Sequence, residues 1–172
     1  MPVALTSFHV RLMGPEPDPE GEGNETRPGP LRRAIATCLG VEEAHVYDGR
    51  RPQTVKAAVD CCLTLQARRP FGRRQTEHVY RVAVRVRGPD GATRKGKNQL
   101  DSIDYYLAAL EAAFGHGRPL QDSVGADLQA VRLVRAATDV EPDEVGNVEG
   151  QADLVLLTNG TGDLDGLQSP GG

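Results

Sequence analysis

The side chains of this sequence whose types and spacing could do chemistry are mostly basic. Arg81, Arg85 and Arg87 alternate with apolar residues, and a strand with this two-residue period projects all three from one face. Further basic residues lie in the flanking segments: Arg68, Arg69, Arg73, Arg74, Arg94, Lys95 and Lys97. Such groups bind phosphates or carboxylates. Phe71 is the one aromatic residue interleaved with them, so stacking recognition of single strands or bases is not favoured.

Groups that could catalyse a reaction or hold a metal are not gathered by any motif. The four histidines fall in unrelated segments, and the cysteines at 38, 61 and 62 form no Cys-x-x-Cys pair and have no histidine at ligand spacing. His78 lies on the apolar side of a predicted strand, which favours a packing role over that of a base. We therefore predict no enzyme activity, no metal site and no cofactor.

Two other segments have the composition of a binding loop without its spacing. The acids Asp139, Glu141, Asp143 and Glu144 match no calcium loop, so a solvated loop is favoured. Residues 88–97 are rich in glycine and lysine and precede a predicted helix, a context in which backbone donors bind phosphate. They lack the Gly-Lys-Ser/Thr of a P-loop, so the sequence indicates phosphate binding only weakly.

Charge is segregated along the chain. The net charge is −4, yet residues 50–97 hold 13 of the 20 Lys and Arg residues against three acids, which makes this segment about +10 and the remainder about −14. This pattern suits a polyanionic partner for the middle segment, or copies of the chain that pair basic surface with acidic surface. A solvated face of mixed charge is the third interpretation.

Length and composition predict one globular unit with a tail at each end. Residues 1–30 are predicted to be an N-terminal arm and a linker rich in proline and acids, residues 31–158 an α+β domain, and residues 159–172 a flexible tail. Residues 3–13 are apolar enough to pack on their own core or on a neighbouring subunit. Because apolar runs fall short of the roughly 20 residues of a membrane span and the start is unlike a signal peptide, we expect a soluble protein made in a cytoplasm, with no membrane partner.

Periodicity predicts the order helix, three strands, helix, two strands. The first helix covers residues 31–39, opened by Pro30 and closed by Gly40. The second has apolar residues at helical spacing that should cover the apolar strand face: Leu100, Ile103, Leu107, Leu110 and Phe114 on Tyr80, Val82, Val84 and Val86. The strands cover residues 44–47, 59–66, 80–87, 128–135 and 152–157, with loops at 68–74 and 139–149. The predicted fold is α+β, a mostly antiparallel open sheet of about five strands with both helices on one face.

Residues 31–158, about three quarters of the chain, resemble the tail terminator, or tail completion, proteins of long-tailed bacteriophages. The resemblance lies in the order and texture of the elements: a leading helix, a short strand before a turn (HVYDGRRP), two strands around a loop (VDCCLTLQARRP and EHVYRVAVRVRG), a helix (NQLDSIDYYLAALEAAF), a strand (LQAVRLVRA), an acidic loop and a closing strand (EGQADLVLLT).

This resemblance implies a structural role in the virion. Members form a homo-oligomeric ring, a hexamer, that caps the tail tube at its final length and offers the surface to which the filled head joins. The implied partners are copies of the same chain, the tail-tube protein and the head–tail connector or neck proteins, while DNA passes through the channel without specific binding. The resemblance implies no enzyme activity, and a location in the tail or neck of the virion after assembly in the host cytoplasm.

Segregated charge suggests how such a ring would close. A ring of heterologous contacts needs two different complementary surfaces on each copy. Our hypothesis is that Arg81, Arg85 and Arg87 of one subunit face the acidic loop of the next, at Asp139, Glu141, Asp143 and Glu144.

Two alternatives remain open at this point. One is another neck protein, a head-completion or connector protein, which would share the class but not the position. The other is a double-stranded nucleic-acid-binding domain, because helix, three strands, helix resembles the double-stranded RNA-binding fold and basic residues 94, 95 and 97 precede the second helix. Asp101 and Asp104 on that helix, the acidic chain and the two additional strands weigh against it.

Overall fold

A computed structural model of the chain describes residues 9–10, 12–52, 57–72, 74–87, 99–114, 129–135 and 147–159, with the side chains of 99–102, 129–131 and 159 outside this description. The helices are α2 (Pro30–Leu39) and α3 (Gln99–Phe114), with a short 3-10 turn, η1 (Glu43–His45). The strands are β1 (Glu16–Pro17), β2 (Thr26–Arg27), β3 (Val46–Asp48), β4 (Val59–Phe71), β5 (Gln75–Val86), β6 (Gln129–Arg135) and β7 (Val148–Asn159).

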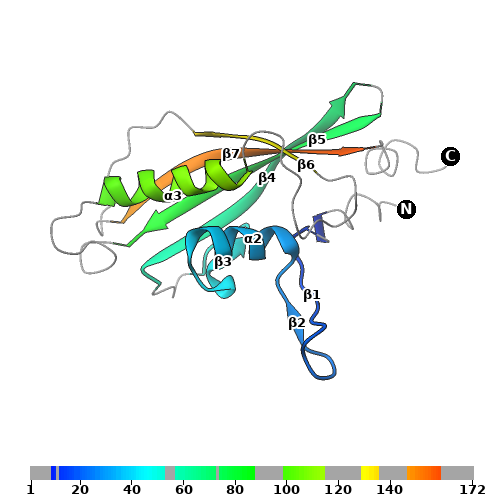
Figure 1. The fold of residues 1–172 in the computed structure, drawn as a ribbon, viewed down its shortest axis with the longest axis horizontal. Helices are drawn as coiled ribbons and strands as arrows, with labels where there is room; N and C mark the ends of the chain where they lie inside the picture. The colour runs from blue at the N-terminus through cyan, green and yellow to red at the C-terminus, as the bar shows by residue number, and fades with distance from the viewer. Residues whose placement is uncertain are drawn as a thin grey trace.

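The strands β3 to β7 form one five-stranded sheet in the order β3-β4-β5-β7-β6, and β1 and β2 form a separate hairpin. Strand β3 is parallel to β4, whereas the other neighbours in the sheet are antiparallel. Figure 1 shows α2 and α3 on one side of this sheet. The predicted α+β fold, with an open, mostly antiparallel sheet and two helices packed on it, is confirmed.

Helix α2 begins and ends where its sequence indicates. Pro30 occupies the first turn, where a missing N–H costs no hydrogen bond, and Gly40 ends the helix in the left-handed region at φ 69°. Leu31, Ile35 and Leu39 recur every four residues on one face, and all three are buried.

The core lies between the helices and the covered face of the sheet. The predicted alternation in β5 is confirmed, because Tyr80, Val82, Val84 and Val86 are all buried. The predicted apolar stripe of α3 is confirmed where its side chains are described: Ile103, Leu107, Leu110 and Phe114. Gly150 of β7 allows the close approach of α3, since a Cβ atom there would lie 2.3 Å from Cγ2 of Ile103.

Several predicted boundaries are wrong. Residues 68–71, predicted to belong to a loop, are part of β4, which continues to Phe71 and pairs with β5 as far as Gln75. Strand β7 is also longer than residues 152–157 and pairs with β5 along its whole length. Backbone pairing rather than an apolar pattern therefore sustains this end of the sheet. Residues 44 and 45 belong to η1, so β3 begins at Val46.

The described part of the N-terminal segment packs on the molecule's own core. Leu12 and Met13 are fully buried. The His9 ring stacks on the Tyr80 ring with centroids 5.9 Å apart, and its Nε2 lies 3.2 Å from each carboxylate oxygen of Asp48. Residues 1–8, the glycine- and lysine-rich residues 88–97, most of the acidic loop (139–146) and the tail after residue 159 lie outside the described residues.

Candidate functional site: the charged open face

The sheet face opposite the helices, which we call the open face, carries the arginines predicted to form a subunit contact. Strand register places carboxylates beside them: Arg85 stands between Asp60 and Glu149, and Arg81 stands opposite Asp153. Directly opposed side chains on neighbouring strands are close enough to interact, and opposite charges there stabilise the sheet. The register therefore pairs these charges within one chain.

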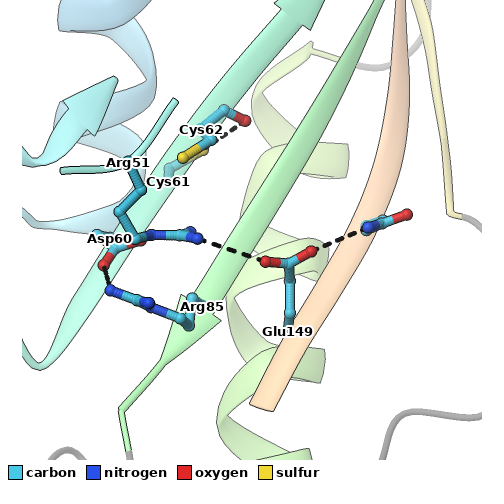
Figure 2. Close-up of polar contacts among 7 residues, drawn as sticks. Arg51, Asp60, Cys61, Cys62, Arg85 and Glu149 are labelled. Carbon is cyan, nitrogen blue, oxygen red and sulfur yellow. Dashed lines mark hydrogen bonds and ion pairs between the residues drawn. The ribbon is translucent and has the colours of Figure 1, made fainter. Parts of the chain in front are cut away.

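Asp60 is the centre of one cluster on this face. Its side chain is fully buried, and it accepts hydrogen bonds from Arg51 and, at 2.7 Å, from Nη2 of Arg85 (Figure 2). Nη1 of Arg51 lies 3.6 Å from Glu149. A buried carboxylate needs such partners, because removing an ion from water costs several kcal/mol. Nη2 of Arg51 and Nε of Arg85 are buried without hydrogen-bond partners among the described residues, so this cluster leaves two donors unsatisfied there.

Electrostatic effects on Arg51 show how tightly it is held. Burial lowers the pKa of Arg51, but the negative groups around it, Asp60 first and also Glu149, together with the hydrogen bond to Asp60, outweigh burial and raise the pKa above its ordinary value. The guanidinium group therefore stays charged. It therefore remains ion-paired with the buried carboxylate of Asp60.

Arg81 forms a second cluster that continues the first across the sheet. Its Nε donates to Asp153 at 2.6 Å and its Nη1 donates to Oε1 of Gln151 at 2.8 Å. The amide of Gln151 in turn donates to Glu149 at 2.9 Å. Both side chains of the Arg81 and Asp153 pair are about one third exposed, so solvent screens this pair more than the Asp60 cluster.

The predicted basic stripe is therefore balanced by acids. Arg51, Arg81 and Arg85 contact Asp60, Glu149 and Asp153, three positive groups against three negative ones. A surface neutralised in this way offers little net charge to a phosphate backbone. The balance counts against an open-face nucleic-acid interface.

The structure brings together a different set of residues from the predicted contact. Arg81 and Arg85 share the open face, and Arg87 follows β5 with an exposed side chain. Asp139, Glu141, Asp143 and Glu144 lie outside the described residues, so their contact with a neighbouring subunit stays a prediction. The acids that contact the arginines are in strands, at positions 60, 149 and 153.

Sequence reasoning missed Asp60 and Arg51. A signal existed for Asp60, because a single acid inside the apolar run VDCCL must find a partner when the strand is buried. No comparable signal marks Arg51. It reaches Asp60 only because the chain after β3 returns beside the first residues of β4.

The cysteines near this cluster are unreactive because they are buried. Cys61 and Cys62 are consecutive residues of β4, so their side chains lie on opposite faces of the sheet, and both are buried. Burial raises the pKa of each thiol, so both remain protonated at neutral pH and are poor nucleophiles. Neither adds catalytic chemistry to the open face.

Beyond the helices, β4 and β5 continue as a hairpin extension that we call the distal hairpin, residues 67–79. His78 is fully buried there, with Nε2 3.1 Å from Oγ1 of Thr158, and Nδ1 accepts a hydrogen bond from Arg68. Burial, and secondarily the charge of Arg68, lowers the pKa of His78 to about 3. The ring is neutral and hydrogen-bonded at both nitrogens.

The tip of the distal hairpin is exposed and basic. Arg69 is 61% exposed and pairs with Glu77 at 2.5 Å, and Arg74 is exposed. The Phe71 side chain beside them is 49% exposed. Arginine and aromatic side chains are the types most enriched at the centres of protein interfaces.

The described residues provide neither a metal-binding cluster nor a membrane-spanning helix. They contain no group of three or more His, Cys, Asp or Glu side chains placed to hold a metal ion. Among the described helices, neither α2 nor α3 has the length and apolar character to cross a membrane.

Comparison with known proteins adds no family. No protein-family model matches the sequence, and no curated protein is similar to it.

Proposed function

We propose that this protein is a structural subunit of a long-tailed bacteriophage, the tail terminator. Six copies form a ring that caps the tail tube and provides the surface to which the head joins. Its partners are other copies of the chain, the tail-tube protein and the connector proteins of the neck, and DNA passes through the ring without specific binding. The protein acts in the virion and turns over no substrate.

The observation that supports this proposal most is an open sheet with two different edges. At one edge, β3 pairs only with residues 61–63 of β4, and residues 64–71 of β4 have no second partner strand in the described chain. At the other edge, β6 pairs with β7 alone among the described strands. Unpaired edges favour association with another chain, and two unlike edges suit a heterologous ring.

The order of elements supports the same proposal. Helix α2, three strands, helix α3 and two strands is the order by which the sequence resembles tail terminators. The charge-balanced open face favours this structural role over the double-stranded nucleic-acid-binding alternative, since that alternative needs a basic surface free to contact phosphates.

Oligomeric state tests the proposal. The purified chain is examined by light scattering, native mass spectrometry and negative-stain electron microscopy, alone and with purified tail-tube protein from the same phage. We expect a six-membered ring in solution or on the ends of the tubes. A chain that stays monomeric under both conditions would overturn the proposal.

Two further measurements separate the alternatives. A gel shift with duplex DNA and RNA at about 0.15 M salt should show no complex, because specific phosphate contacts are not part of the proposed role. Immunogold labelling of phage particles should mark the head-proximal end of the tail. Label on tailless heads would favour a connector or head-completion protein instead.

A further inference from the structure

Two hairpins project from the domain in different directions and carry opposite charge. One is the β1–β2 hairpin, which we call the acidic hairpin, residues 15–27; the other is the distal hairpin. Figure 1 shows them at opposite edges of the molecule, the acidic hairpin below α2 and the end of β4 and β5 at the top. One copy therefore cannot join its own two hairpins. Contact between them requires two copies.

The acidic hairpin has acids, most of them exposed, that the described residues of its own chain do not neutralise. Glu16 at its base is paired with Arg27 and Arg33, at 2.8 and 2.7 Å. Four further acids lie toward the tip, and none forms an ion pair within the described chain: Asp18, Glu20, Glu22 and Glu25. The tip thus carries about −4 at neutral pH.

The acidic hairpin is also held in a fixed direction. At its base Gly14 and Gly29 are packed so closely that a Cβ atom on Gly29 would lie 2.4 Å from the carbonyl oxygen of Leu12. The N–H of Gly29 donates to Met13 at 2.9 Å, and Glu16 is held by Arg33 of α2. A preorganised arm loses less entropy on binding than a flexible one. These contacts at its base fix the direction in which the acidic hairpin projects from the domain.

The distal hairpin offers the complementary surface. Arg68, Arg69 and Arg74 against Glu77 give its described residues a net charge of +2, that is 3 − 1. Phe71 supplies an exposed aromatic ring beside Arg69 and Arg74 in sequence. The acidic hairpin supplies exposed prolines at alternate positions, Pro15, Pro17 and Pro19. Proline-bearing extended segments pack well on aromatic side chains.

We propose that the acidic hairpin of one copy binds the distal hairpin of the next copy around a ring. The exposed acids face Arg69 and Arg74, and the prolines pack on Phe71. The contact is heterologous, with each copy giving one hairpin and receiving the other, so it closes a ring or extends a filament. This inference rests on the proposed function and assigns its subunit contact to the hairpins instead of the open face.

Charge reversal on each side tests the contact. The first variant reverses the acidic hairpin (Glu20→Lys, Glu22→Lys, Glu25→Lys) and the second reverses the distal hairpin (Arg69→Glu, Arg74→Glu). We expect each alone to assemble at least about tenfold more weakly than the natural chain at low salt, since like charges then face each other. Mixed in equal amounts, the two should assemble again in alternation, because each supplies the charge that the other lacks. Assembly is followed by light scattering and native mass spectrometry.

A control variant tests whether the effect is specific to the hairpins, and a further variant tests the contribution of Phe71. Glu42→Lys with Glu43→Lys changes exposed acids outside both hairpins and should leave assembly unchanged. Circular dichroism and thermal unfolding confirm that every variant is folded. Phe71→Ala keeps the charges and should also weaken assembly, whereas salt at about 0.5 M should weaken the natural contact by screening.

Each outcome separates this inference from the proposed function. If the natural chain forms rings and the reversed variants do so equally well, or the mixture fails to reassemble, the hairpin contact is wrong and the tail-terminator proposal stands. If the hairpins bind but yield dimers or filaments without rings, the contact stands and the proposed function fails. If the natural chain is monomeric even with tail-tube protein, both are wrong.

Discussion

The two ends of the hairpin formed by β4 and β5 contain the same residue type in opposite situations. At the end covered by the helices, Arg85 contacts fully buried Asp60 and is itself only 20% exposed. At the other end, Arg69 pairs with Glu77 but is 61% exposed, and Arg74 is exposed. The difference shows that an arginine's role depends on what its strand register places beside it. Buried pairs maintain the sheet, and exposed ones remain available to a partner.

The largest expected effect lies at the covered end. Asp60→Ala leaves Arg51 and Arg85 without their shared carboxylate, and we expect a loss of about 3–5 kcal/mol in the free energy of unfolding, the usual cost of breaking a buried ion pair. Urea unfolding measures it. Asp60→Asn, which keeps some hydrogen bonding, should lose less. An unchanged midpoint for Asp60→Ala would mean that the cluster contributes nothing to the fold.

A smaller effect is expected at His78, inside the distal hairpin. Its pKa in the folded chain is about 3, below the value near 6.5 in an unfolded chain, so the unfolded state binds the proton first as pH falls. Folding stability should therefore decrease below about pH 6.5, and from pH 7 to pH 5 this one group should account for about 2 kcal/mol.

Comparison with His78→Gln isolates that contribution. The variant lacks the titrating ring, so its stability should fall by about 2 kcal/mol less than that of the natural chain over the same pH interval. Urea unfolding at the two pH values gives the difference. Parallel losses in both proteins would show that folding does not lower the pKa of His78.

Arg81 lies between the two extremes. Its pair with Asp153 is about one third exposed on both sides, and solvent screening limits such pairs. Arg81→Ala should cost about 1 kcal/mol or less in unfolding free energy. A loss as large as that of Asp60→Ala would show that exposure does not decide the role of an arginine in this sheet.

The smallest effect on stability is expected at the tip. Arg74→Glu should change the free energy of unfolding by no more than about 0.5 kcal/mol, as surface substitutions usually do. The same substitution should nevertheless weaken assembly. If the variant lost stability but assembled normally, Arg74 would stabilise the fold as the buried arginines do. That is the opposite of what its exposure indicates.

Much of the fold could be predicted because apolar periodicity is local. The alternation around Val82 and the helical stripe through Leu107 each predict which face of the strand or helix is buried. The order of elements follows from such runs. Polar pairing could not be predicted in the same way. The distal hairpin was interpreted as a loop because residues 68–74 contain four arginines, a proline and a glycine, yet β5 supplies backbone partners for β4 as far as Phe71.

The candidate site was only partly predictable for the same reason. The shared face of Arg81 and Arg85 follows from a period of two. Their carboxylate partners come from β4 and β7, up to 72 residues away in sequence, and only strand register identifies them. The composition of residues 1–30 predicts an arm and a linker, whereas the contacts of Glu16 with Arg27 and Arg33 hold residues 15–27 as a projecting hairpin.

By itself the sequence determined the α+β class, the apolar face of β5, the ends of α2 and the separation of charge along the chain, since each depends on neighbours within a few turns or a single strand. The tertiary structure alone decided which charged side chains form ion pairs within the molecule and which remain exposed to solvent. The physical reason is that an ion pair depends on distance and burial, and both are set by the register of strands far apart in sequence.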